Sequence, residues 1–265
     1  MATSHSHDNP KLARTYDRLS DPQFEGGQEL VERLDVKSGD AVLDVGCGTG
    51  RLTQWIAGRD AVCVVGIDPL PERVALARER APGIRFEVGS AEDLAVFADA
   101  SFDVVCLSAV FHWIEDKARA LREFARVLRP RGRLGVTTLP KELHRAGTMA
   151  EVCGPVVGRP PYRERAHFVG AHDQGVTLTE MVTMLQGTGL DLRELHVVER
   201  TQLRKSGEEV IDFVESSTFG NFLSMVPEDL RPGLRADLVA AFEARRGPEG
   251  IAIRDYALLL VATRR

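Results

Sequence analysis

The segment AVLDVGCGTG, residues 41–50, constrains the fold of this 265-residue chain more than any other stretch. Apolar residues on both sides of Asp44 are typical of a strand buried on both faces. Gly46, Gly48 and Gly50 follow at every second position, and glycine lets a backbone turn sharply and approach a ligand closely. The apolar residues of segment 51–58 share one helix face, so the start of that helix would direct free N–H groups into the turn. The pattern predicts a strand that ends in a ligand-binding loop.

The charge beside this loop restricts the kind of ligand that it can hold. A loop that binds a dinucleotide pyrophosphate is expected to read G-x-G-x-x-G, whereas this chain reads G-x-G-x-G with Asp44 two residues before the first glycine. A carboxylate there repels phosphate and attracts a cation. The alternative is a purely structural turn in an α/β protein. The motif closely resembles the D-x-G-x-G-x-G loop of class I S-adenosylmethionine-dependent methyltransferases. That resemblance implies that Asp44, Gly46, Cys47 and Gly48 bind the cationic amino-acid end of S-adenosylmethionine.

A second acidic residue stands where such a fold holds a ribose. Residues 61–67 form a predicted buried strand that ends in Asp68, about 20 residues after the glycine turn. One carboxylate can accept hydrogen bonds from both vicinal hydroxyls of a ribose. We therefore expect Asp68 to bind the cofactor ribose and Pro69, with Leu70, to lie beside the adenine.

The third and fourth predicted strands, residues 84–88 and 102–107, extend the resemblance. The third strand is followed by GSAEDL, and related methyltransferases often carry Asp or Asn where this chain has Ser90. The resemblance implies that Ser90 and its neighbours meet the edge of the adenine. Ala91 can contribute only its backbone, so Glu92 is the nearest alternative side chain.

The segment after the fourth strand carries the candidate reacting groups, because ligands of open α/β sheets bind outside the carboxyl ends of the strands. We expect Ser108, Phe111, His112 and Trp113 to face this centre, where aromatic faces would suit a sulfonium methyl group. His112 is the candidate catalytic residue, as a general base at neutral pH. The other interpretation is that His112 caps the backbone or contacts the cofactor.

The N-terminal part of the chain reads as two helices, residues 11–20 and 28–34. Tyr16 lies in the first helix. In the resembling family a tyrosine in this helix often closes over the cofactor, and the alternative is a tyrosine packed on the edge of the domain. We therefore assign residues 1–27 to a helical segment over the cofactor site.

Composition excludes several classes of protein. A net charge of −5 gives no reason to expect a nucleic-acid partner, and no apolar run is long enough to cross a bilayer. The polar N-terminus shows no signal peptide, so we expect a cytoplasmic protein. The four cysteines lack C-x-x-C spacing and indicate neither a metal site nor a disulfide framework. Cys63 and Cys106 lie in strand-like runs and are expected in the core.

The whole pattern predicts an α/β fold, a doubly wound, Rossmann-like, seven-stranded and mostly parallel sheet with an antiparallel last strand and helical cap inserts. Residues 28–138 form the predicted cofactor-binding core, and residues 139–175 a substrate-side insert. Residues 176–265 supply the rest of the sheet, with a helical lid at 208–246. A fifth strand is expected at 134–138, and the last strand follows the lid.

The resemblance points to small-molecule methyltransferases similar to the trans-aconitate, ubiquinone-pathway and biotin-pathway enzymes. A lid rich in phenylalanine favours an apolar, aromatic or prenyl-like acceptor, whereas Arg159, Arg163 and Arg165 could hold a carboxylate or phosphate. Arsenite methylation needs thiolates, and only Cys153 lies in a plausible substrate segment. A Rossmann-type oxidoreductase or nucleotide-binding module is the remaining alternative. The oligomeric state, monomer or homodimer, stays open, because the apolar lid could instead meet another subunit.

Overall fold

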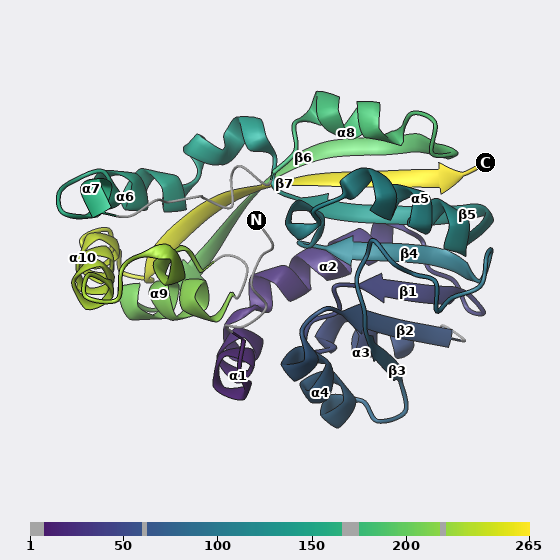
Figure 1. The fold of residues 1–265 in the computed structure, drawn as a ribbon, viewed down its shortest axis with the longest axis horizontal. Coiled ribbons are helices and arrows are strands. Elements are labelled where there is room, and N and C mark those ends of the chain that lie inside the picture. Colours follow the sequence, from purple (N-terminus) through teal and green to yellow (C-terminus); the bar gives the residue numbers. More distant parts are fainter. Residues whose placement is uncertain (1–7, 60–62, 166–174, 218–220) are drawn as a thin grey trace. The chain divides into compact units, whose positions relative to one another are not determined.

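The computed structural model describes residues 8–59, 63–165, 175–217 and 221–265. The chain divides into two units, and Figure 1 labels the helices and strands that make them up. The sheet unit consists of Asp21–Thr138, Val176–Val197 and Leu258–Arg265. The insert unit consists of Met1–Ser20, Leu139–Gly175 and Val198–Ala257. The boundary that we predicted at residue 27 falls inside a helix of the sheet unit.

Seven strands form one sheet in the order β3-β2-β1-β4-β5-β7-β6. The strands are β1 (Ala41–Val45), β2 (Cys63–Asp68), β3 (Arg85–Val88), β4 (Phe102–Ser108), β5 (Leu128–Thr138), β6 (Leu190–Arg204) and β7 (Ile251–Arg264). Strands β1 to β5 pair in parallel, and β7 pairs antiparallel with β5. This order confirms the predicted doubly wound sheet with an antiparallel last strand.

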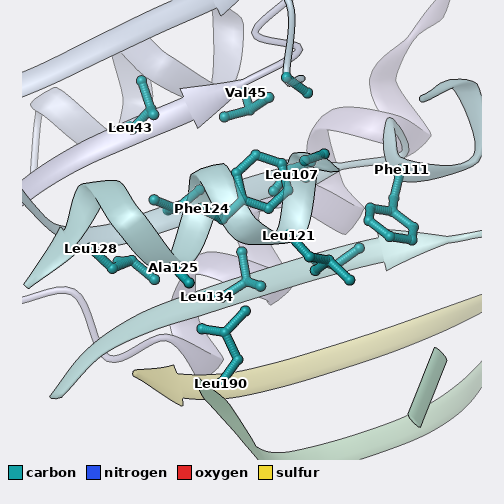
Figure 2. Close-up of a cluster of buried hydrophobic side chains, with 14 of the residues drawn as sticks. Leu43, Val45, Leu107, Phe111, Leu121, Phe124, Ala125, Leu128, Leu134 and Leu190 are labelled. Atoms are coloured by element: carbon teal, nitrogen blue, oxygen red, sulfur yellow. The ribbon is translucent and has the colours of Figure 1, made fainter. Parts of the chain in front are cut away.

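Helices cover both faces of the sheet, which explains why its strands read as continuous apolar runs. On one face, α5 (Lys117–Val127) and α8 (Leu178–Leu185) pack in one hydrophobic cluster with strand residues such as Leu43 and Leu134 (Figure 2). The other face carries α2 (Asp21–Arg33) and α3 (Arg51–Ala57), which pack with Val42 and Val104. Helix α4 (Pro71–Arg80) packs in a smaller cluster that includes Phe86 of β3.

Two expectations for the sheet unit are wrong. Helix α2 begins at Asp21, seven residues before the predicted start, and runs through Gly26 and Gly27. A Cβ atom on Gly27 would lie 2.7 Å from Leu52 and 3.1 Å from the Ser108 hydroxyl, so this glycine allows a close approach of α2 that local sequence does not reveal. Cys63 is exposed instead of buried, because it is the first residue of β2, whereas the burial of Cys106 is confirmed.

The insert unit joins both predicted inserts around one hydrophobic cluster. Its helices are α1 (Pro10–Leu19), η3 (Lys141–Ala146), α6 (Thr148–Val157), α7 (Tyr162–Arg165), α9 (Gly207–Ser216), η5 (Phe222–Met225) and α10 (Arg231–Glu243). Val152 and Tyr162 from the first insert pack with Ile211, Leu234 and Phe242 from the second. The sequence showed no periodicity in residues 139–175, because Gly154 and Pro155 interrupt the pattern of α6. None of the described helices is long and apolar enough to cross a membrane.

Candidate functional site

The glycine loop connects β1 to α3 at the carboxyl edge of the parallel strands. The N–H groups of Gly46 and Cys47 donate to the carbonyl oxygen of Ile67, at 2.7 and 2.9 Å, which ties the loop to the end of β2. Gly46, Gly48 and Gly50 have φ angles of +73°, +55° and +77°, in the left-handed region that glycine adopts without strain. The loop therefore needs glycine at all three positions for its backbone path.

The space around the three glycines shows which side of the loop is open. A Cβ atom on Gly46 would lie 2.3 Å from Val110, and one on Gly50 would lie 2.8 Å from Ala77. A Cβ atom on Gly48 would meet nothing within 4 Å. Gly46 and Gly50 thus pack against protein, while Gly48 faces open space, as a residue that lines a ligand cradle should. The loop fits the predicted role of holding a ligand against its backbone.

Asp68 supports this loop from the end of β2. Its Oδ2 accepts a hydrogen bond from the N–H of Gly48 at 3.0 Å, and its Oδ1 accepts from the N–H of Leu70 at 2.9 Å. The side chain is 6% exposed. Each carboxylate oxygen has two lone pairs and can accept more than one hydrogen bond. The predicted ribose contact stays a prediction, and the structure gives Asp68 a second role as an acceptor for the glycine loop. Pro69, partly exposed, follows it.

Asp44 lies deeper than the resemblance implies. Its carboxyl group is 1% exposed, on the sheet face that α3 covers. The Thr53 hydroxyl donates to its Oδ2 at 2.7 Å, and the Cys106 thiol lies 3.8 Å from its Oδ1. Burial raises the pKa of Asp44 from 3.8 to about 6, against the lowering effect of these two hydrogen bonds. Attraction of a cationic cofactor by Asp44 stays a prediction.

Cys47 turns into the protein beside Asp44 and Asp68. Its side chain is 8% exposed and packs with Val74, Ala77 and Phe86. Burial, together with the two nearby carboxylates, raises the pKa of the Cys47 thiol. Cys47 therefore offers a ligand its backbone, and its thiol stays protonated at neutral pH.

Replacement of Asp44 by asparagine is expected to stabilise the protein above pH 6 and to weaken cofactor binding. The folded state keeps the Asp44 proton up to about pH 6, while the unfolded state releases it near 3.8. Wild-type stability therefore falls as pH rises through this window, by on the order of 3 kcal/mol. The amide variant lacks this loss, and it also lacks the negative charge that we expect to attract a cation, so binding should weaken about tenfold. Urea unfolding at pH 4.5 and 8, with calorimetric titration of S-adenosylhomocysteine, measures both.

For this prediction, Asp99→Asn is the matched control, since Asp99 is an exposed partner of Arg126. A parallel pH dependence of stability in Asp44→Asn and wild type would contradict the raised pKa of the buried Asp44 carboxyl group.

The predicted adenine-binding residues follow β3 at the same edge of the sheet. The N–H of Gly89 donates to the carbonyl oxygen of Asp68 at 3.1 Å. The Ser90 hydroxyl bonds to one oxygen of Glu92, whose other oxygen accepts from the N–H of Glu115 at 3.0 Å. Ala91 is 7% exposed. Glu92 thus connects the loop after β3 to the segment before α5, and the adenine contacts of these residues stay predictions.

The segment after β4 divides into buried and accessible groups. Ser108 ends β4, and its hydroxyl donates to the carbonyl oxygen of Gln23 at 3.3 Å. Phe111 does not face the reacting centre as predicted, because its ring is fully buried against the cluster that α5 covers (Figure 2). Trp113 remains partly exposed, and its ring lies 4.5 Å from the His112 ring.

His112 lies at the end of this segment, 4% exposed. Its Nδ1 is 3.2 Å from the hydroxyl oxygen of Thr138 at the end of β5. Burial, with a smaller effect of Lys117, lowers the pKa of His112 to about 3. A ring with that pKa is neutral at pH 7 and accepts a proton poorly. The structure gives His112 a hydrogen-bonding partner in the Thr138 hydroxyl. The general-base role and the alternative, backbone capping or a cofactor contact, both stay predictions.

The variant His112→Asn is expected to keep turnover within about tenfold of wild type, because a positioned general base contributes 10²–10⁴-fold and a hydrogen-bonding ring less. Asparagine keeps a polar atom for Thr138. The pH dependence of turnover between 5 and 8 should be the same in both proteins, since a pKa of about 3 places the His112 titration below this range. Steady-state rates with labelled methyl donor measure this. A loss beyond 100-fold together with a lost acidic limb would establish the base.

The remaining predicted residues lie on the insert unit. The Tyr16 ring stacks on the Phe213 ring, with centroids 5.9 Å apart. The Arg204 guanidinium lies 4.7 Å from the centroid of the same Phe213 ring. The closing of Tyr16 over the cofactor stays a prediction. Of the three arginines that could hold a carboxylate or phosphate, two form ion pairs, Arg159 with Asp237 and Arg165 with Asp229, both at 2.8 Å.

Comparisons with known proteins bear on this site. A family model described as a methyltransferase domain matches residues 43–136. An uncharacterized methyltransferase of Mycobacterium tuberculosis is 35% identical over 193 residues, which cover 72% of this chain and 70% of that protein. The nocamycin O-methyltransferase of Saccharothrix syringae is 30% identical over 247 residues, covering 86% of this chain and 87% of that protein. A solved S-adenosylmethionine-dependent methyltransferase from Mesorhizobium loti shares the fold, with a TM-score of 0.53 and 20% sequence identity. The match covers 91% of this chain and 100% of that protein.

The sheet order, the glycine loop and the family match together define a class I S-adenosylmethionine-dependent methyltransferase. This chain belongs to the methyltransferase family, and S-adenosylmethionine is its cofactor.

Sequence reasoning missed three supporting residues of the site. Thr53 bonds to Asp44, Thr138 lies against His112, and Val110 packs on Gly46. Only the hydroxyl of Thr53 gave a local signal, since it lies in the first turn of the helix that follows the glycines. The other two contacts join strands or turns that are distant in sequence.

Proposed function

We propose that this enzyme transfers the methyl group of S-adenosylmethionine to an oxygen atom of a small molecule. The observation that supports oxygen as the acceptor is the likeness to the nocamycin O-methyltransferase, which extends over 86% of the chain and so includes at least part of the insert regions. A match confined to residues 43–136, such as that of the family model, supports only the cofactor-binding core and not the kind of acceptor.

The residues of the sheet unit have defined tasks in this proposal. The backbone of Gly46–Gly48 holds the amino-acid end of the cofactor, Asp68 accepts the ribose hydroxyls, and Pro69 with residues 90–92 surrounds the adenine. Ser108 and His112 face the methyl group. The bound cofactor supplies a sulfonium whose methyl carbon is electrophilic, so the protein has mainly to align the acceptor in line with it and exclude water.

The neutral His112 ring bears on the chemistry of the acceptor. An alcohol must lose its proton during methylation, whereas a carboxylate or acidic phenol is already ionised at pH 7 and needs no base. Because the lowered pKa of His112, about 3, makes this ring a poor base, we propose that the acceptor oxygen is acidic and already ionised at pH 7. An acidic acceptor would react without proton transfer to the protein.

An apolar or aromatic body of the acceptor is the second part of the proposal. The phenylalanine-rich composition of the predicted lid, residues 208–246, supports it. Phe222 and Leu223 give no such support, because they pack in the core of the insert unit. Phe219, part of the predicted apolar lid, lies outside the described residues.

Arsenite as the acceptor is not favoured by the cysteines. Burial raises the pKa of Cys47 and Cys106, and raises that of Cys153 to about 12, so these thiols do not form the thiolates that bind arsenic. Cys63 is exposed but starts β2, at the opposite edge of the sheet from the glycine loop. Among the described residues no group of three or more His, Cys, Asp or Glu side chains is placed to hold a metal ion.

The test is a transfer assay with a deuterated methyl donor and a panel of aromatic carboxylic acids, phenols, amines and thiols of matched size. Mass spectrometry detects the product, and mild base distinguishes a methyl ester, which releases methanol, from an ether. We expect label on carboxylic acids or acidic phenols only. Label on amines or thiols alone would overturn oxygen as the acceptor while leaving the methyltransferase assignment intact. The Asp68→Ala variant, which we expect to bind the cofactor poorly, is the control for methyl transfer that does not depend on the cofactor site.

A further inference from the structure

The turn that leaves β4 contains a strained residue. Ala109 has a φ angle of +57°, in the left-handed region that costs a residue with a side chain about 1–2 kcal/mol relative to the right-handed one. Such a conformation persists only where surrounding contacts hold it. Here Thr137 of β5 provides those contacts: the Ala109 N–H donates to the carbonyl oxygen of Thr137 at 3.1 Å and to its hydroxyl oxygen at 2.9 Å.

The consequence of this turn is the position of Val110. Its two γ-methyl groups lie 2.3 and 2.7 Å from where a Cβ atom of Gly46 would stand, and its own Cβ lies 3.0 Å from that point. Valine is branched at Cβ, which restricts rotation about χ1, so its methyl groups do not swing aside readily. Val110 therefore occupies the space over the first glycine of the cofactor loop.

The chain is also fixed on the far side of Val110. The Phe111 ring is fully buried in the sheet unit, and the Trp113 N–H donates to the Val110 carbonyl oxygen at 2.8 Å. Val110 is thus held from both ends, by Thr137 through Ala109 and by the buried Phe111. Gly46 in turn is tied to β2 through Ile67. The contact between Val110 and Gly46 closes this chain of contacts from β5 to the glycine loop.

We propose that Val110 and Thr137 are positioning residues for cofactor binding: Thr137 sets the turn that presses Val110 onto Gly46, and this contact fixes the glycine loop in its cofactor-binding path. The inference rests on the proposed cofactor site. It explains why a non-glycine residue adopts a strained conformation at the end of β4, directly beside the candidate reacting centre.

The first test measures the affinity of the full chain for S-adenosylhomocysteine by calorimetry. Val110→Ala is expected to weaken binding about tenfold, because the loop loses the contact that fixes it. Val105→Ala is the matched control: Val105 is a fully buried valine of β4, the strand that leads into this turn, and its truncation lowers stability without touching the loop. Equal affinities in wild type, Val110→Ala and Val105→Ala would overturn the proposal. No binding by folded wild-type protein would overturn the cofactor site, and this inference with it.

A double variant separates positioning from a general loss of packing. Gly46→Ala alone forces a Cβ atom into the Val110 methyl groups and should abolish measurable binding. In that background, Val110→Ala removes both methyl groups and is expected to improve binding several-fold, which reverses the sign of its effect. Additive losses in the double variant would contradict direct contact between the two positions as the cause.

The role of Thr137 is tested by a conservative pair. Thr137→Ser keeps the hydroxyl that accepts from Ala109 and should keep wild-type affinity. Thr137→Val keeps the shape and the carbonyl acceptor but loses the hydroxyl acceptor, so we expect affinity to fall several-fold while the melting temperatures of Thr137→Ser and Thr137→Val stay similar. Equal affinities in these two variants would remove Thr137 from the proposal.

Discussion

Replacement of Asp68 by alanine is expected to weaken the binding of S-adenosylmethionine by about 100-fold or more. The carboxylate accepts from the N–H groups of Gly48 and Leu70 and, in our proposal, from the ribose hydroxyls. Hydrogen bonds to a charged group contribute about 1.5–3 kcal/mol each, so the loss of two to the ribose already accounts for 100-fold. Calorimetric titration with S-adenosylmethionine and with S-adenosylhomocysteine measures the loss.

Two further variants make this result specific. Asp68→Asn keeps one acceptor oxygen and should bind with intermediate affinity. Asp99→Ala removes an exposed carboxylate that pairs with Arg126 and should bind as wild type does. If Asp68→Ala bound the cofactor with an affinity within a few-fold of wild type, the Asp68 carboxylate would accept hydrogen bonds only from backbone N–H groups and not from the ribose.

The second large effect is expected from Gly48→Val. A Cβ atom at this position meets no protein atom within 4 Å, so the isopropyl group would occupy the open side of the loop and block the cofactor. Binding should fall below detection. The stability cost should be limited to the backbone strain of a side chain at φ +55°, about 1–2 kcal/mol. Thermal unfolding and calorimetric titration of the same preparation separate the two effects.

Gly187→Val provides the matched control for this variant. Gly187 has a φ angle of +77° and also faces open space, but it lies in the turn after α8. The same strain is imposed there without blocking the loop, so the control should unfold at a similar temperature and bind normally. Retained binding by Gly48→Val would show that the open side of the glycine loop is not where the cofactor lies.

The parts of the fold that could be predicted are those with strong local patterns. Strands such as β1 and β4 are buried on both faces, so their apolar runs are continuous, and the glycine loop needs its residues for φ angles that only glycine adopts readily. Asp44 and Asp68 could be placed at one edge of the sheet because parallel neighbours end together. These features depend on nearest neighbours in the chain or on adjacent strands.

The predictions that were wrong depend on contacts between residues far apart in sequence. The glycines of α2 read as a helix boundary, and only the approach of Leu52 and Ser108 explains their presence inside the helix. Phe111 reads as an active-site aromatic, yet its ring completes the core under α5. The union of the two inserts around one hydrophobic cluster likewise has no local signal.

The electrostatics of the site could not be predicted from residue types alone. A histidine near the reacting centre suggests a base, but the pKa of His112 depends on its complete burial. The carboxyl group of Asp44 reads as a charge beside the glycine loop, and its position beneath α3 follows only from the side of β1 on which it lies.

The most direct test of the account is a crystal structure of the full chain with S-adenosylhomocysteine. We predict that the ribose hydroxyls lie within hydrogen-bonding distance of the Asp68 carboxylate and that the amino-acid end lies against the backbone of Gly46–Gly48. Density for the ligand at any other place, with the open side of Gly48 filled only by solvent, would contradict the assignment of this loop as the cofactor site.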